Sequence, residues 1–178
     1  MYKAAGVVQE HYESRQKTTK QKDNWLKMTE IRGVFKALGQ QVKSRNLDHK
    51  DDLNDSDKML FQSFLMVAFH GGIMAPQRNH FADLYYVSRN HPRDEDEKNF
   101  IWKGRQGWRV RLNDYKTRGR PNKRKPPVEL RMKPMMSRLL NRYIKAVQLE
   151  FGDSLFFSRK GDKLSKNAYS KRLMAIFK

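Results

Sequence analysis

Hydrophobic positions in the first half of the chain recur with the period of an α-helix. From Trp25 onward they fall at spacings of three and four, as in an amphipathic helix: Met28, Ile31, Phe35, Leu38 and Val42. A second helix is predicted over residues 59–70, and because this stretch carries no formal charge we expect it to be buried. Residues 54–56 offer side-chain caps for its start, and Gly71 and Gly72 offer a left-handed exit.

Beyond Leu84 the apolar positions alternate, which is the period of a β-strand. Strands are predicted at about residues 84–88, 99–103, 107–117 and 127–132. In the third strand, Trp108, Val110 and Leu112 are expected to face one way and Arg109, Arg111 and Asn113 the other. Between the second helix and the first strand, Pro76 suits the first position of a short third helix.

The last part of the chain returns to helical periodicity. Pro134 is expected to open a helix that stops at Gly152, with a buried stripe of Met135, Met136, Leu139, Leu140, Tyr143, Ile144 and Val147. A short strand at residues 154–158 and a turn at 159–163 follow, and Ser165 can cap a final helix. Helices, a small antiparallel β-sheet or hairpin, and helices again predict an α+β fold. Residues 1–23 read as a basic linker or the end of an upstream segment, and residues 24–178 as one folded domain.

The chain has a large excess of positive charge. It contains 38 Lys and Arg against 19 Asp and Glu, a formal net charge of +19. A polyanion is the expected partner, with nucleic acid first and an anionic membrane surface second. Fifteen of the cations lie between Lys103 and Lys145, where only Asp114 and Glu129 are acidic. This concentration is compatible with a solvated basic face and with a surface that follows phosphates.

Other chemistry finds little support. The histidines, His11, His49, His70, His80 and His91, show no short paired spacing. Without cysteine there is no thiolate site either, so we expect no metal and no cofactor. The acidic stretch "DDLNDSD" lacks the glycine and the glutamate of a calcium loop, and no glycine-rich nucleotide loop is present. The uncharged run 59–77 is interrupted by polar residues, Gly and Pro, so no membrane partner is expected.

Two short basic features suggest how DNA could be bound. "RGRP", residues 118–121, resembles the core of an AT-hook, whose arginines enter the minor groove, although a basic hairpin loop or a nuclear-import signal explains it as well. Arg78 follows Pro76 at the expected start of the third helix, where backbone N–H groups favour an anion. A guanidinium placed there can hold a phosphate together with the helix, or can be a plain surface arginine.

The order of these parts resembles the catalytic domain of the tyrosine recombinases over about residues 24–178. "APQRNHFADL" is similar to the variant found in integrases of large DNA viruses and eukaryotic mobile elements, and "NDYKT" resembles the family's β-hairpin motif. "GDSLFFSRKGDKLSKNAYSKRLMAIF" is similar to the strand, turn and helix before the second motif. The resemblance implies that Arg78 contacts the scissile phosphate and that Lys116 assists departure of the 5′ oxygen as general acid.

The same resemblance implies a binding partner and a cellular location. Duplex DNA is the expected partner, a homo-oligomer on DNA is implied by the family, and the protein would act inside a cell, in the nucleus if the host is eukaryotic. The candidate DNA contacts, apart from the two catalytic candidates, are Arg105, Arg109, Arg111, Arg118, Arg120, Lys123, Arg124, Lys125, Arg159 and Lys160.

Two departures from the family pattern limit the expected activity. The acidic residue that usually follows the arginine is replaced by Phe81 or His80, so the acidic partner is missing or is Asp83. The chain also ends at Lys178, before the region of the family's His-x-x-Arg motif and nucleophilic tyrosine, and Tyr169 fits the apolar face of the last helix instead. We therefore expect this chain to bind DNA without covalent chemistry of its own. A non-catalytic basic nucleic-acid-binding module, or a basic face that meets acidic proteins, are the alternatives.

Overall fold

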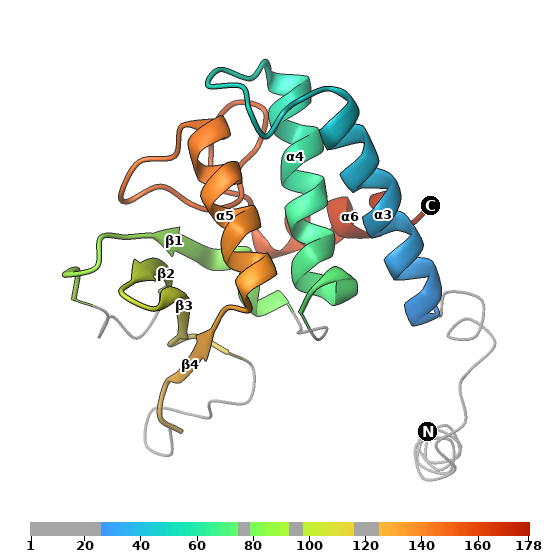
Figure 1. Ribbon diagram of the computed structural model, residues 1–178. Coiled ribbons are helices and arrows are strands. Elements are labelled where there is room, and N and C mark those ends of the chain that lie inside the picture. Colours follow the sequence, from blue (N-terminus) through green and yellow to red (C-terminus); the bar gives the residue numbers. More distant parts are fainter. Residues whose placement is uncertain (1–25, 75–78, 93–97, 116–124) are drawn as a thin grey trace, which may run out of the picture.

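The computed structural model describes residues 26–74, 79–92, 98–115 and 125–178, and their fold is α+β, as expected. Its helices are α3 (Met28–Ser44), α4 (Asp55–Val67), α5 (Pro134–Val147) and α6 (Lys166–Ile176). Figure 1 shows α3, α4 and α5 side by side with α4 in the middle, the sheet beside the start of α5, and α6 behind α4. Because α4 packs against α3, α5 and α6, it forms the centre of the hydrophobic core.

Local signals in the sequence explain how α4 begins and ends. The side chain of Asn54 accepts a hydrogen bond from the backbone N–H of Asp57, which confirms the predicted cap. The helix continues into a π-helical turn, Ala68–Gly72, in which Gly71 has a positive φ of 124°, as predicted for a left-handed exit. Gly72 faces the Phe35 ring of α3 so closely that a Cβ there would lie 2.5 Å from Cδ2. The two glycines therefore let α3 pack directly onto the end of α4.

The sheet is mixed, so the expectation of a small antiparallel sheet was wrong. Its strands are β1 (Leu84–Tyr86), β2 (Asn99–Gly104), β3 (Gly107–Leu112) and β4 (Val128–Arg131), in that spatial order. The pairs β2–β3 and β3–β4 are antiparallel, but β1 and β2 are parallel. Residues 87–98 are long enough for the crossover that parallel strands need, since such connections take about a dozen residues.

One face of the sheet is packed against the helices. Trp108, Val110 and Leu112 are buried on this side, and α5 packs onto β3. Arg109 and Arg111 are half-exposed on the opposite face, as expected. That face also carries a small second cluster of Val87, Phe100 and Trp102. Asn113 lies just beyond the end of the strand and is buried, but its Oδ1 accepts a hydrogen bond from Nε of Arg111 at 3.0 Å, so its side chain does meet an arginine of this face.

Some expected boundaries were displaced. The strand expected over residues 107–117 ends at Leu112, because the next two backbone N–H groups bond to a side chain and not to a neighbouring strand. The helix from Pro134 ends at Val147 and not at Gly152, with Gln148 in the left-handed conformation. Met135, expected in its buried stripe, is 51% exposed. Residues 154–158 make single β-bridges in place of a strand.

Some of the remaining expectations are confirmed, and others concern residues that the structure does not describe. Ser165 caps α6 by accepting a hydrogen bond from the N–H of Ala168, as predicted. The acidic loop before α4 is not merely solvated, since Asp48 pairs with Arg142 and Asp51 with Lys145. Pro76 lies outside the described residues, and the helix after it is a short 3-10 turn, Asn79–Asp83. The linker at residues 1–23 also lies outside them.

Candidate nucleic-acid interface

A buried asparagine joins two loops at one end of the sheet. Asn99, the first residue of β2, is fully buried, and its Nδ2 donates to the carbonyl oxygens of His80 at 3.1 Å and Asp114 at 3.0 Å. Its Oδ1 accepts from the backbone N–H groups of Asn113 and Asp114, both at 2.8 Å. One amide side chain thus holds the 3-10 turn before β1 against the loop after β3, and we call this contact the Asn99 junction.

The two loops of the Asn99 junction are close in the sequence to both residues that were proposed for chemistry. His80 comes two residues after Arg78, and Asp114 comes two residues before Lys116. The rings of His80 and Tyr115 meet edge to face with centroids 6.2 Å apart, so the two loops also touch through side chains. Arg78 and Lys116 themselves lie outside the described residues. The structure brings together the chain segments next to them, although His80 and Asp114 are 114 − 80 = 34 residues apart in the sequence.

 Asn99 stands between them in the sequence, 19 residues after His80 and 15 before Asp114, so the contact is a tertiary one.

Nothing in the periodicity indicated Asn99 as a key residue. The only signal was a polar residue directly before the apolar run "FIW", at the start of the strand predicted over residues 99–103. A buried amide needs partners for its donors and its acceptor, and at this position the two loops supply them. Its role therefore became visible only when the three segments were seen together.

A network of ion pairs ties α6 to the same place. Asp83 is 91% buried and pairs with Lys163 at 2.9 Å and with Lys166 at 3.1 Å, and Lys166 also reaches Asp114 at 2.6 Å. The hydrogen bond to Asp114 and the pair with Asp83 raise the pKa of Lys166 against the effect of its partial burial. Burial lowers the pKa of Lys163, but its bonds to Tyr85 and Asp83 outweigh this and raise it. Both lysines therefore stay charged at neutral pH and fix the start of α6 beside the Asn99 junction.

This network bears on the acidic partner that the resemblance requires. Asp83 engages two lysines of the later part of the chain. Phe81 is fully buried with its ring 4.6 Å from that of Phe69, so it belongs to the core. His80 contributes its carbonyl to the Asn99 junction and its ring to Tyr115. Of the three positions considered, Asp83 is the one that carries a carboxylate, and within the described residues its partners are lysines.

The candidate DNA contacts on the sheet do not form one cluster with the Asn99 junction. Arg105 is exposed at the β2–β3 turn, whereas Asp114 follows the other end of β3. Six residues of strand separate the two ends, or about 20 Å at the usual rise of roughly 3.3 Å per residue. Arg109 and Arg111 lie between them on the outer face, where Glu129 of β4 approaches Arg111 at 3.3 Å and Arg109 at 4.0 Å.

The other candidate contacts fall into two groups. Arg118, Arg120, Lys123 and Arg124 lie outside the described residues, and Lys125 is exposed just before β4. Arg159 and Lys160 are exposed at the tip of the turn that precedes α6. Since Lys163 at the base of this turn pairs with Asp83, the turn belongs to the surroundings of the Asn99 junction.

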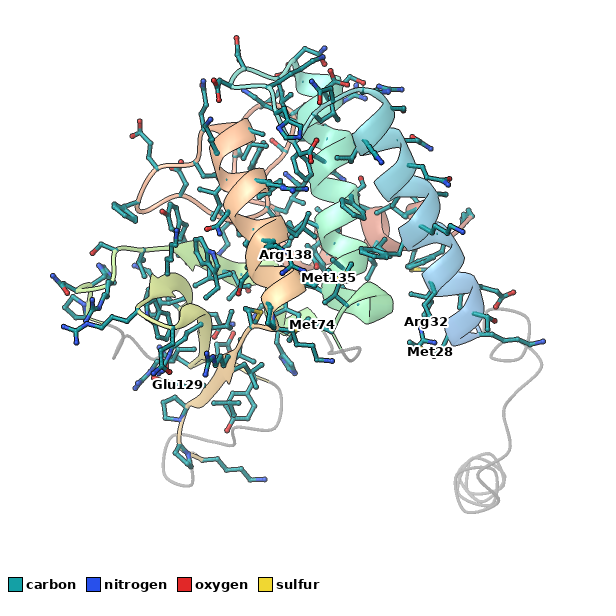
Figure 2. The ribbon with its side chains drawn as sticks, viewed as in Figure 1. Met28, Arg32, Met74, Glu129, Met135 and Arg138 are labelled. Carbon is teal, nitrogen blue, oxygen red and sulfur yellow. The ribbon has the colours of Figure 1, made fainter. Side chains whose placement is uncertain are left out.

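Sequence reasoning missed two cations from the helices. Figure 2 shows Arg32 on α3 and Arg138 on α5 on either side of Met74, the last described residue before residues 75–78. Both arginines are exposed, and so are Met28 and Met135 on the same two helices. The apolar stripes of the sequence concern the buried side of each helix, so they could not show that these exposed residues gather around Met74.

Tyr169 is a core residue, as expected. It is fully buried, its hydroxyl lies 3.0 Å from Nε2 of His70, and burial raises its pKa far above the ordinary value for tyrosine. A nucleophile must reach the phosphate and lose its proton, and this hydroxyl is prepared for neither. Among the described residues, no group of His, Asp and Glu side chains could hold a metal ion.

The helices and the comparisons with known proteins give no further indication of function. In the part of the chain that the structure describes, none of the helices has the length and apolar character needed to cross a membrane. Comparison with protein-family models, with curated proteins and with solved structures found no match to this chain.

Proposed function

We propose that this chain is the DNA-binding portion of a site-specific tyrosine recombinase or integrase, in which Arg78 and Lys116 act on the same phosphate of duplex DNA. The observation that carries the proposal is the Asn99 junction, because it joins the described segments that adjoin these two residues. A general basic surface has no need of such a joint, since it can spread its cations over any exposed loop.

The chemistry assigned to the two residues is complementary. When a nucleophile attacks the phosphorus atom, negative charge grows on the phosphoryl oxygens, and the Arg78 guanidinium would stabilise it with two hydrogen bonds. The bond from phosphorus to the 5′ oxygen then breaks, and Lys116 would give this oxygen its proton. The attacking hydroxyl belongs to a region that the family carries after the part matched here. This chain therefore supplies DNA binding, charge stabilisation and a proton donor.

A double-mutant cycle on DNA affinity tests the proposal. Binding of a roughly 20-base-pair duplex is measured by fluorescence anisotropy for wild type, Arg78→Ala, Lys116→Ala and the double variant. Each single change should weaken binding about 10-fold, since hydrogen bonds to charged groups contribute roughly 1.5–3 kcal/mol. If both side chains contact one phosphate, the two losses should couple by at least about 0.5 kcal/mol.

The matched control uses exposed lysines of the helices that have no assigned role. Lys36→Ala and Lys171→Ala remove the same charge, and each should weaken binding by about twofold and add to the effect of Lys116→Ala. If the control variants lose as much affinity as Arg78→Ala and Lys116→Ala, and no pair couples, the chain is the alternative, a non-catalytic basic binding module.

A further inference from the structure

We propose that a pocket on the outer face of the sheet, at the β2–β3 turn, binds a phosphate group. It has a volume of about 420 Å³, and its lining includes Arg89, Trp102, Arg105, Gln106, Arg109 and Glu129. The pocket lies at the opposite end of β3 from the Asn99 junction, so it is a second site. It is argued from the sheet alone and does not rest on the proposed function.

The strand register places like charges opposite each other beside this pocket. Arg109 of β3 stands directly opposite Arg131 of β4, an arrangement that destabilises a sheet. On its other side Arg109 faces Trp102 of β2. The Arg131 side chain reaches the β2–β3 turn, where its Nη2 donates to the carbonyl oxygen of Gln106 at 2.9 Å. A bound anion would offset the repulsion that the register creates.

The acid in the pocket leaves a positive balance. Glu129 is the described acidic residue in its lining, and it lies closer to Arg111, at 3.3 Å, than to Arg109, at 4.0 Å. Its single negative charge is thus shared between Arg109, which lines the pocket, and Arg111, which does not. Arg89 and Arg105 bring two further positive charges to the lining. The sum over the charged residues of the lining, Arg89, Arg105, Arg109 and Glu129, is 3 − 1 = +2.

Phosphate is the anion that this lining suits. Arginine presents a planar fork of donors that binds two phosphate oxygens at once. Trp102, which is 5% exposed, supplies an apolar wall on one side of the pocket. The phosphate can belong to a small phosphate compound or to a nucleic-acid backbone, and both offer the same oxygens.

Nuclear magnetic resonance with inorganic pyrophosphate tests the pocket. The signals followed are the indole N–H of Trp102 and the Nε–H groups of Arg105 and Arg109. They should shift in a saturable way, while the indole of Trp108, which donates to Asn141 on the helix side of the sheet, should not. The paired change Arg105→Gln and Arg109→Gln should weaken pyrophosphate binding by about tenfold or more. The control, Lys36→Gln with Lys171→Gln, removes the same charge and should leave the affinity within about twofold.

A second titration identifies the source of the phosphate. If duplex DNA displaces pyrophosphate from the Trp102 and Arg109 signals, the pocket holds a backbone phosphate; if both remain bound, it holds a separate phosphate compound. Shifts spread evenly over the arginines, or equal losses in the paired variant and its control, would overturn the pocket. Because Arg78 and Lys116 are left intact in all these proteins, such a failure is distinct from failure of the recombinase proposal.

Discussion

Replacing Asn99 should destabilise the fold and loosen the loops beside Arg78 and Lys116. Asn99→Ala removes four hydrogen bonds and leaves the N–H groups of Asn113 and Asp114 and the carbonyls of His80 and Asp114 without this partner. At about 1 kcal/mol for each net hydrogen bond, the loss is about 4 kcal/mol. Domains are stable by roughly 5–15 kcal/mol, so the variant should still fold but with much of its margin gone.

Asn99→Asp distinguishes the hydrogen bonds that the side chain at position 99 accepts from those that it donates. The carboxylate keeps the two accepted hydrogen bonds, but when ionised it donates none and faces the carbonyl oxygens of His80 and Asp114. Burial and these oxygens should raise the pKa of this aspartate in the folded state above its unfolded value of about 3.9. The unfolded chain then binds fewer protons than the folded one, so the variant should lose stability relative to wild type as pH rises from about 4 to 7.

Urea unfolding followed by tryptophan fluorescence measures both effects, and amide hydrogen exchange at Asn113 and Asp114 locates them. Asn90→Ala, at an exposed turn position, is the control and should change stability by less than about 0.5 kcal/mol. The reasoning fails if Asn99→Ala costs less than about 1 kcal/mol, or if exchange at Asn113 and Asp114 keeps its wild-type rate. It also fails if the deficit of Asn99→Asp does not grow with pH.

Three further outcomes are expected. Affinity for duplex DNA should fall by about 10³ to 10⁵ between roughly 50 and 200 mM salt if about 6 to 10 phosphates are contacted, and a flat response would remove the electrostatic basis of binding. The 178-residue chain should trap no covalent adduct with nicked or intact duplex on a denaturing gel, and an adduct would make Tyr169 the first residue to mutate. Gly72→Ala should lower the free energy of unfolding by about 1–3 kcal/mol in thermal unfolding, because its Cβ would meet Phe35. Gly33→Ala should raise it by about 0.5–1 kcal/mol, because a Cβ there meets nothing within 4 Å. Equal effects of the two changes would contradict the close packing at Gly72.

The helices could be predicted because their signals are local. The apolar stripe of α3, the Asn54 and Ser165 caps and the Pro134 start all lie within a few residues of the feature they specify. The left-handed Gly71 belongs to the same class. The end of α5 was not predicted correctly, because Gln148, a residue type that gives no stop signal, takes the left-handed conformation four residues before the expected stop at Gly152.

The sheet and the interface depended on contacts between distant segments. The parallel pairing of β1 with β2 joins strands that are separated by residues 87–98 in the sequence, and alternation of apolar residues does not encode such a pairing. Nothing in the sequence linked Lys163, before α6, and Lys166, its first residue, to a common partner, and only the fold brings them to Asp83. The described cations of the basic stretch lie on or beside the sheet and on α5, as predicted, but how those of the sheet are distributed along β3 needed the register.

The Asn99 junction distinguishes focused binding from general attraction to phosphates. Attraction needs only cations, and the chain has 38 of them. A buried amide with four partners adds no charge, yet it specifies one arrangement of the loops because any other would leave polar groups unpaired in the core. Lys166 also fixes the arrangement of the chain, since its charge pairs with the carboxylates of Asp83 and Asp114. Precise placement of loops matters when two groups must act on the same atoms, and so the neutral and internally paired residues support the recombinase proposal more than the surface cations do.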